Sequence, residues 1–275
     1  MKPSDRNSTT RASTIIATIV ITFGLATACA RAAAAGEPAP VRALANVFEG
    51  TLRDTDPIPE VSTAELQAAL KDPKVVVLDA RPFPEFAVSH IPGARSVPGK
   101  PGLPPAHYTA DAAEIIKKVP DHAQALVLYC NGPYCGRSKR FGAELQKAGY
   151  KNVRRYQLGI PTWRALGGVT QVEREALATL LRTDGTAVLI DAREPGAAGP
   201  PLANARSIVL AEASKAKDDG RLPMSDHNTR IFVVGDNGAQ ARAVAEAIVR
   251  DAFHNVSFYD GAAGDLPELL KLPPK

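Results

Sequence analysis

The chain has 275 residues, of which 45% are apolar and 5% aromatic. This length allows one large or two medium domains, and the composition suits an aliphatic-cored α/β protein and excludes a wholly disordered chain. The formal net charge is +4, but most of the excess lies in the first 35 residues, so the remainder predicts no nucleic-acid binding and no general attraction to anionic membranes.

The N-terminus has the features of a secretory signal. Basic residues precede the apolar stretch STIIATIVITFGLA (13–26), which is too short to span a bilayer comfortably, and Ala33 and Ala35 offer a small-residue cleavage site. We therefore interpret residues 1–35 as a signal peptide, which predicts export to a bacterial periplasm.

The stretch LATAC (25–29) leaves an alternative fate for this segment. It resembles, imperfectly, the lipobox of bacterial lipoproteins, in which Cys29 would be acylated and would anchor the chain to a membrane. Ordinary cleavage would remove Cys29. In either case Cys130 and Cys135 are the only thiols of the globular part, and they would face an oxidising compartment.

Residues 36–58 are rich in Pro, Gly, Ala and charge and read as a linker, after which the chain repeats itself. Short β-branched runs alternate with helical patterns, which predicts parallel strands with helices on both faces. Six segments recur in the same order: VSTAELQAAL (61–70), KVVVLDARPFPEF (74–86), HIPGARSV (90–97), ALVLYC (125–130), AGYKNVRRY (148–156) and GIPTWRALG (159–167), then REALATLL (174–181), AVLIDAREP (187–195), ANARSIVL (203–210), RIFVVGDNG (230–238), DAFHNVSFYDG (251–261) and DLPELL (265–270).

Both units resemble rhodanese domains. The resemblance of the first rests on DAR (79–81) with Glu85, on HIPGA (90–94), on a strand ending in Cys130, on RS (137–138), and on Gly159 with Trp163. It implies an α/β protein of two tandem rhodanese-like domains, each a parallel β-sheet core flanked by helices on both faces. We expect a catalytic domain over 59–168 and a degenerate, inactive domain over 171–275, where Gly235 stands in place of the cysteine and Leu266 in place of Trp163.

Cys130 is the candidate nucleophile of the first unit. It lies between a strand and a helical pattern, where backbone N–H groups favour the reactive thiolate. Glycines allow the loop to wrap around an anion, and Arg137, Lys139 and Arg140 add positive charge. The residues that we expect to bind the substrate are Asn131, Gly132, Tyr134, Gly136, Arg137, Ser138 and Lys139.

The resemblance implies sulfur transfer in two half-reactions. Cys130 takes the outer sulfur of thiosulfate or a similar small anionic donor, becomes a persulfide, and passes the sulfur to a thiol acceptor or a thioredoxin-like protein. No cofactor is implied. We expect no metal either, because the two cysteines lack a nearby Cys or His pair.

The Cys130 loop departs from the family pattern. Counted to the anchors AGYKNV and DAFHNV, it is two residues longer than its counterpart from Gly235, which predicts a wider pocket; phosphatases and arsenate reductases use the same Cys-then-Arg logic for larger oxyanions. Cys135 stays open between three roles: a resolving thiol, a regulatory disulfide partner, or the nucleophile itself.

Three other residues support the loop in this interpretation. Asp79 and Arg81 recur as Asp191 and Arg193 in the unit without a cysteine, which indicates a loop-bracing pair. Trp163 is expected to pack beside the loop. His90 is expected to cap a loop, Ser138 to cap the following helix, and Lys100 to be solvated.

Three functions remain open at this level. The first is an exported sulfurtransferase. The second is a periplasmic thiol/disulfide redox or binding module that uses Cys130 and Cys135. The third is a non-catalytic scaffold with the same fold.

Overall fold

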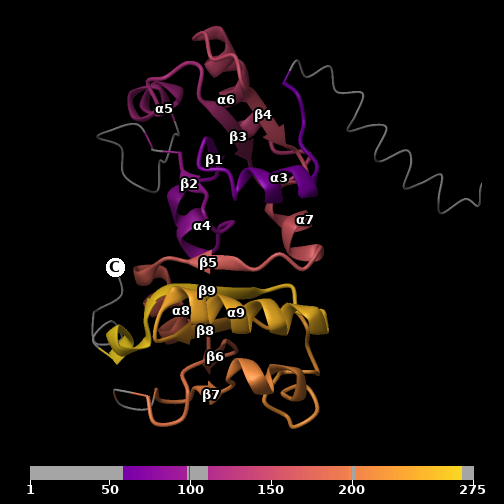
Figure 1. The fold of residues 1–275 in the computed structure, drawn as a ribbon, viewed down its shortest axis with the longest axis vertical. Coiled ribbons are helices and arrows are strands. Elements are labelled where there is room, and N and C mark those ends of the chain that lie inside the picture. Colours follow the sequence, from indigo (N-terminus) through magenta and orange to yellow (C-terminus); the bar gives the residue numbers. More distant parts are fainter. Residues whose placement is uncertain (1–57, 98, 100–110, 198, 200–201, 268–275) are drawn as a thin grey trace, which may run out of the picture. The chain divides into compact units, whose positions relative to one another are not determined.

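The computed structural model describes residues 58–97, 99, 111–197, 199 and 202–267, which belong to one compact unit. The predicted signal peptide, Cys29, most of the predicted linker and Lys100 lie outside these residues. The described chain forms two separate parallel sheets, one from each repeat (Figure 1).

The first sheet has the strand order β2-β1-β3-β4 and is parallel throughout. Asp79 pairs with Tyr129, and Tyr129 pairs with Tyr156, so the central strands end level with one another. The residues after these strand ends therefore share one edge of the sheet, the edge at which open α/β sheets place their sites. The strands are β1 (Val75–Asp79), β2 (Arg95–Ser96), β3 (Ala125–Tyr129) and β4 (Val153–Tyr156).

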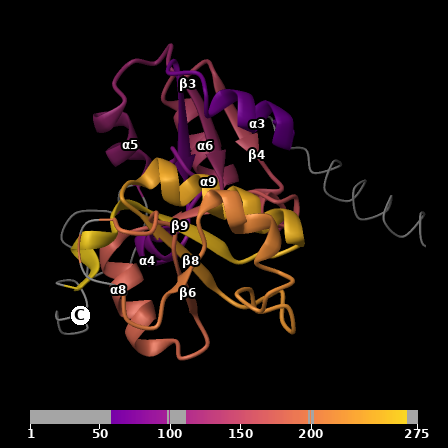
Figure 2. The ribbon, with the colours of Figure 1, turned by 60° about the horizontal axis from the view of Figure 1, so that its bottom comes forward.

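The central strands β1 and β3 are buried on both faces of this sheet, which explains why they are continuous apolar runs instead of alternating ones. Val76 and Leu78 pack on the face of α5 and α6, whereas Val77 points to the opposite face with residues of α3 and α7. Figure 1 shows these helices around the sheet, and Figure 2 shows α3, α5 and α6 beside it from another side. The helices are α3 (Thr63–Ala69), α4 (Phe83–Val88), α5 (Ala112–Lys118), α6 (Gly136–Lys147) and α7 (Gly159–Ala165).

The second sheet has the order β5-β9-β8-β6-β7 and is also parallel. Ile190 and Val233 pack with residues of α9 on one face, and Leu189 and Phe232 pack with residues of α8 on the other. The predicted fold class is thus confirmed. The elements are β5 (Thr170–Val172), α8 (Arg174–Thr183), β6 (Val188–Asp191), β7 (Arg206–Ser207), η2 (Leu210–Lys215), β8 (Ile231–Gly235), α9 (Gly238–Ile248), η3 (Val249–Asp251), β9 (Val256–Ala262) and η4 (Ala263–Asp265).

The connection between the repeats is anchored by backbone hydrogen bonds. Gln171 in β5 exchanges two with His90, at N···O distances of 2.8 and 3.0 Å, and the N–H of Glu173 donates to the carbonyl of Ala87 at 2.8 Å. The segment after α4 is thereby paired with β5. Across the part of the chain that the structure describes, no helix has the length and apolar character needed to cross a bilayer.

Candidate active site

Cys130 lies directly after β3, at the carboxyl edge of the first sheet, and is 1% exposed. Its carbonyl accepts a hydrogen bond from the N–H of Ile160 at 3.0 Å, which ties the start of the loop to the first turn of α7. The sequence prediction that Cys130 follows a strand end therefore holds in the structure, and the backbone around it is held by a second element.

Two glycines allow this close approach. Gly132 has φ +106° and Gly159 has φ +66°, conformations that L side chains rarely adopt. A Cβ on Gly159 would collide with the backbone of Cys130 and of Gly132. Gly136, by contrast, has no positive φ and is the first residue of α6, so only Gly132 of the two loop glycines supplies the turn.

Cys130 and Cys135 are joined by a disulfide, with their Cα atoms 6.1 Å apart. Cys135 is partly exposed and is the N-cap residue of α6, and its N–H donates to the carbonyl of Gly132 at 3.0 Å. The prediction that Ser138 caps this helix is wrong: Ser138 lies inside the first turn and is buried. The helix begins at Gly136, so Cys135 takes the capping position.

Glu85, from α4, contacts the loop from the side. Its carboxylate accepts a hydrogen bond from the Asn131 side chain at 2.7 Å and lies 3.7 Å from the Arg137 guanidinium. Both charged side chains are more than one-third exposed, so this ion pair is weak, but it offsets part of the positive charge expected at the loop. In the sequence, Glu85 stands out only as part of the rhodanese signature, and its contact with the loop is not predicted.

The remaining predicted substrate-binding residues surround the start of α6. Tyr134 is 90% exposed at the tip of the loop, and Lys139 is partly exposed. Arg140, the third basic residue, lies 3.8 Å from Glu144 one turn along the helix. The loop thus presents an aromatic ring and basic groups to solvent, whereas the candidate nucleophile Cys130 is buried.

Asp79 and Arg81 form a buried brace beneath this edge. The Asp79 carboxylate accepts the Arg81 backbone N–H at 2.9 Å and guanidinium N–H groups at 2.5 to 3.1 Å, and Arg81 also donates to the carbonyl of Ser89 at 2.6 Å. Burial acts to lower the pKa of Arg81, but the hydrogen bonds and charge of Asp79 outweigh it, so that pKa is raised. Arg81 is therefore charged and paired.

The same brace exists in the second repeat. Asp191 accepts the backbone and side-chain N–H groups of Arg193 at 2.7 to 3.2 Å. Because the second repeat has no cysteine, this recurrence supports a structural role for the pair in both repeats.

Trp163 packs below the same region. Its indole N–H donates to the carbonyl of Val169 at 2.9 Å, and the ring is 6% exposed in a cluster with Tyr129 and Ile160. Since Ile160 also binds the Cys130 carbonyl, Trp163 supports the element on which the loop rests.

The corresponding loop of the second repeat closes on itself. Gly235 ends β8, the N–H of Asp236 donates to the Gln240 side chain at 2.7 Å, and the Asn237 side chain caps α9 through the Gln240 N–H at 3.0 Å. The loop carries a carboxylate and no thiol, so it lacks the sulfur nucleophile expected of the first repeat, and its negative charge would repel an anionic sulfur donor.

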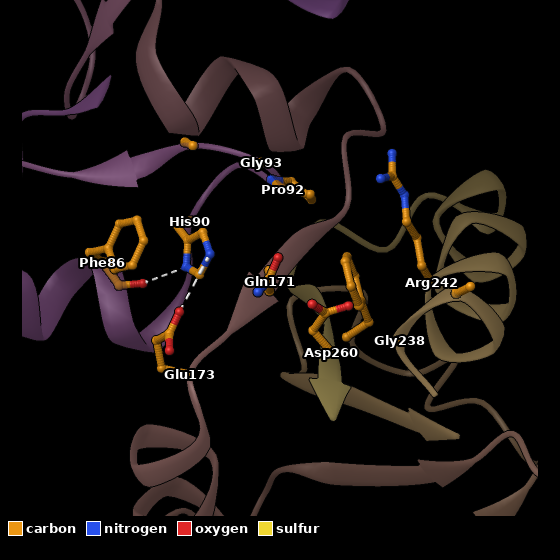
Figure 3. Close-up of a pocket in the computed structure, with 12 residues that line it drawn as sticks. Phe86, His90, Pro92, Gly93, Gln171, Glu173, Gly238, Arg242 and Asp260 are labelled. Carbon is orange, nitrogen blue, oxygen red and sulfur yellow. Dashed lines mark hydrogen bonds and ion pairs between the residues drawn. The ribbon is translucent and has the colours of Figure 1, made fainter. Parts of the chain in front are cut away.

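A cavity of about 540 Å³ lies elsewhere, beside His90 (Figure 3). Figure 3 shows His90 next to Phe86 and Glu173, with Asp260 and Arg242 across the cavity. Burial lowers the pKa of His90 to about 4, so the ring is neutral; its Nδ1 lies 3.0 Å from the Phe86 carbonyl, and the two rings stack 3.8 Å apart. No residue of the Cys130 loop lines this cavity. The sequence predicts that His90 caps a loop, and the structure places its ring against the Phe86 carbonyl in the last turn of α4.

Within the described ranges, no group of three or more His, Cys, Asp or Glu side chains is arranged to hold a metal ion. Once the disulfide is reduced, the two thiols of the Cys130 loop can support nucleophilic attack on an electrophilic sulfur or cycling between dithiol and disulfide.

Comparison with known proteins defines the class of protein. The chain matches the rhodanese-like domain over residues 62–166 and again over 173–263, and it belongs to that family as a tandem member. The predicted domain limits of 59–168 and 171–275 enclose these matches and otherwise stay a prediction.

Particular relatives are more distant. Over 140 residues, 46% of this chain and 95% of the relative, the sequence is 27% identical to the thiosulfate:glutathione sulfurtransferase of Saccharomyces cerevisiae. The thiosulfate sulfurtransferase structure from Pseudomonas aeruginosa is 20% identical, with 78% of this chain and 43% of that chain covered and a TM-score of 0.35. The structure of SseA from Escherichia coli, described as a 3-mercaptopyruvate sulfotransferase, is 18% identical, with 75% and 99% covered and a TM-score of 0.34.

Proposed function

We propose that this protein is an exported sulfurtransferase that moves a sulfane sulfur from thiosulfate, or a similar anionic donor, to a thiol acceptor through a Cys130 persulfide. The observation that carries the proposal is the place of Cys130: it follows β3, a central strand of a rhodanese-like domain, and opens a loop that leads into the N-terminus of α6. The sulfurtransferase relative named above gives further support.

The chemistry begins from the reduced loop. The Cys130 thiolate attacks the outer sulfur of thiosulfate, the sulfur–sulfur bond of the donor breaks, and sulfite leaves with the bonding electron pair. The product is a persulfide on Cys130. An acceptor thiolate then attacks the outer persulfide sulfur and restores the Cys130 thiolate, so no net oxidation of the protein occurs.

The loop offers the groups that this reaction needs. Backbone N–H groups of the loop and of the first turn of α6 stabilise negative charge on sulfur, and Arg137 and Lys139 attract a dianionic donor. The turn at Gly132 and the contact with α7 hold Cys130 in place. The second repeat, without a thiol, serves as a structural partner in this proposal.

The export part of the proposal rests on residues 1–35 of the sequence. Intact-mass measurement of the protein purified from its native cell tests it. A mature chain that begins at Gly36 supports a free periplasmic protein, whereas a chain that begins at an acylated Cys29 supports a lipid anchor. An unprocessed chain that begins at Met1 contradicts export.

Mass spectrometry of the reduced protein treated with thiosulfate tests the sulfur transfer. We expect a gain of the mass of one sulfur atom on Cys130 and its loss in Cys130→Ser, measured in the Cys135→Ser background so that Cys130 cannot re-form the disulfide. A sulfur adduct on the single variant Cys130→Ser, which keeps Cys135, assigns the nucleophile to Cys135 and overturns the proposal.

A second candidate function is supported by the Cys130–Cys135 disulfide itself. In that case the loop cycles between dithiol and disulfide and exchanges electrons with another thiol protein, without sulfur transfer. A protein that loses and regains only two hydrogen atoms, and gains sulfur from no donor, supports this candidate.

A further inference from the structure

We propose that Cys135 is the built-in resolving thiol for the persulfide formed on Cys130. Its thiolate resolves the Cys130 persulfide, releases hydrosulfide and leaves the disulfide, which an external dithiol protein then reduces. This inference rests on the first half-reaction of the proposed function, the formation of the Cys130 persulfide, and gives the second half-reaction an internal thiol in place of an external acceptor; it names both the product and the class of partner. It also joins the Cys130 persulfide and the Cys130–Cys135 disulfide in one catalytic cycle, although taken separately they favour sulfur transfer and thiol/disulfide exchange.

The first support is reach. The disulfide shows that the Cys135 sulfur reaches the Cys130 Sγ, which is the inner sulfur of a persulfide. The Cα–Cα distance of 6.1 Å falls in the ordinary range for disulfides, about 4.4 to 6.8 Å, so no backbone movement is needed to form the bond.

The second support is that the backbone, and not the disulfide alone, holds the cysteines together. The Cys130 carbonyl accepts the Ile160 N–H at 3.0 Å, and the Cys135 N–H donates to the Gly132 carbonyl at 3.0 Å. Both bonds are independent of the sulfur–sulfur bond. The reduced loop therefore keeps Cys135 beside Cys130 while the donor reacts.

The third support is the position of Cys135 at the N-cap of α6, a helix of 12 residues with no side-chain cap hydrogen bond. Free N–H groups in the first turn of a helix favour a thiolate over a thiol. A serine or aspartate at this position would supply an ordinary cap, whereas a cysteine supplies a nucleophile that points into the loop.

The step balances in atoms and electrons. The Cys135 thiolate attacks Cys130 Sγ, a bond forms between the two cysteine sulfurs, and the bond from Sγ to the outer sulfur breaks. The outer sulfur leaves as hydrosulfide with the electron pair of that bond and the persulfide proton. The sulfane sulfur is reduced and the cysteine pair is oxidised by two electrons.

Each cycle therefore needs two electrons from outside, and a dithiol protein of the thioredoxin type supplies them by thiol–disulfide exchange. Overall, thiosulfate and a dithiol give sulfite, hydrogen sulfide and a disulfide. Cys135 is partly exposed whereas Cys130 is 1% exposed. The incoming thiolate thus attacks Cys135 and releases Cys130, which is the sulfur that must be free for the next donor.

The exposed ring of Tyr134, directly before Cys135, offers a contact surface for that protein. Its 90% exposure is unusual for a tyrosine in a folded domain, and aromatic side chains contribute strongly to protein contacts. The proposed electron donor therefore docks over the loop tip, on the Cys135 side.

A single-turnover experiment on the reduced full chain tests this inference. After removal of the reductant under anaerobic conditions, the protein receives thiosulfate, and sulfite, hydrosulfide and intact mass are measured. The wild type is expected to release about one sulfite and about one hydrosulfide per chain and to end two hydrogen atoms lighter. Cys135→Ser is expected to release about one sulfite, no hydrosulfide, and to gain one sulfur atom.

The matched control is Ala143→Ser, which places a serine on the exposed face of the same helix, away from the loop. It should behave as the wild type. Cys135→Ala, judged folded by circular dichroism, repeats the measurement without a hydroxyl. Addition of dithiothreitol should give many turnovers of hydrosulfide in the wild type, with at least a tenfold slower release in both Cys135 variants.

The outcomes separate the two proposals. A wild-type protein that keeps a stable persulfide and releases no hydrosulfide overturns the inference about Cys135 and leaves the proposed sulfur transfer standing. Hydrosulfide release that is unchanged in both Cys135 variants overturns it as well. If no variant releases sulfite or gains sulfur, the sulfur-transfer function itself is wrong.

Discussion

Replacing Gly159 by alanine tests how the loop is held. Gly159 has φ +66°, and a Cβ there would collide with the backbone of both Cys130 and Gly132. Gly167 offers a matched control, because it has φ +80° with nothing within 4 Å of the added Cβ. The two substitutions share the backbone strain and differ in the collision with the loop.

The expected magnitudes follow from that difference. Left-handed backbone costs an L residue about 1 to 2 kcal/mol, so Gly167→Ala should lower the free energy of unfolding by about that amount. Gly159→Ala adds the cost of overpacking against backbone atoms, about 1 to 3 kcal/mol more. Because the collision is relieved only by moving the loop, sulfite release from thiosulfate should slow about tenfold or more.

Urea unfolding of both variants, with the disulfide intact, measures the stabilities, and sulfite release by the reduced proteins measures the rates. Gly167→Ala should keep the wild-type rate. Equal losses of stability in the two variants, together with a wild-type rate in Gly159→Ala, would refute the argument that the start of α7 positions Cys130.

Three further predictions concern the surrounding structure. Burial lowers the pKa of His90 to about 4, so below about pH 6.5 the unfolded chain binds a proton that the folded chain does not bind. The free energy of unfolding, measured with a chemical denaturant, should therefore fall by about 2 kcal/mol between pH 7 and pH 5. His90→Gln should abolish this fall. Asp79→Asn leaves the Arg81 guanidinium buried without its carboxylate, and it should lower the free energy of unfolding in urea by about 3 kcal/mol. The loss should be smaller for Asp191→Asn, because the Asp191 side chain is 16% exposed. Trp163→Phe removes the indole N–H that donates to the Val169 carbonyl and should lower the free energy of unfolding by about 1 kcal/mol.

Each of these has a contrary outcome. Burial raises the pKa of Glu173, so the protonation of this carboxylate stabilises the folded state as the pH falls, opposite to the effect of His90. A free energy of unfolding that rises from pH 7 to pH 5 would mean that the effect of Glu173 exceeds that of His90. A larger loss in Asp191→Asn than in Asp79→Asn would contradict the burial argument for the brace. No loss in Trp163→Phe would show that water replaces the indole donor.

Much of the fold follows from local patterns. The apolar runs that end at Asp79 and at Cys130 carry no alternation, which is the signature of strands buried on both faces, and their recurrence in the second repeat made the tandem arrangement visible. The repeat also separated scaffold from chemistry, because the Asp79–Arg81 pair recurs without a cysteine. The placement of Cys130 at a strand end needed no tertiary information.

The cap of α6 and the contacts of the loop could not be predicted in this way. Ser138 has a better intrinsic preference for the N-cap than cysteine, but the helix begins at Gly136 and Cys135 is the N-cap residue. Glu85 reaches Asn131 and Arg137 from an element more than 40 residues away in the sequence. Such contacts depend on how α4 packs against the sheet, and no local propensity encodes them.

The sequence by itself thus determined the architecture and pointed to Cys130 as the candidate nucleophile, because strand burial and repeat position are properties of short segments. The three roles open to Cys135 were narrowed only by the tertiary structure. A loop of this length allows many Cys130–Cys135 distances, and the turn at Gly132 together with the contact against α7 selects one in which the sulfurs bond. Tertiary packing therefore places the two thiols of this loop close enough to form one disulfide-bonded pair.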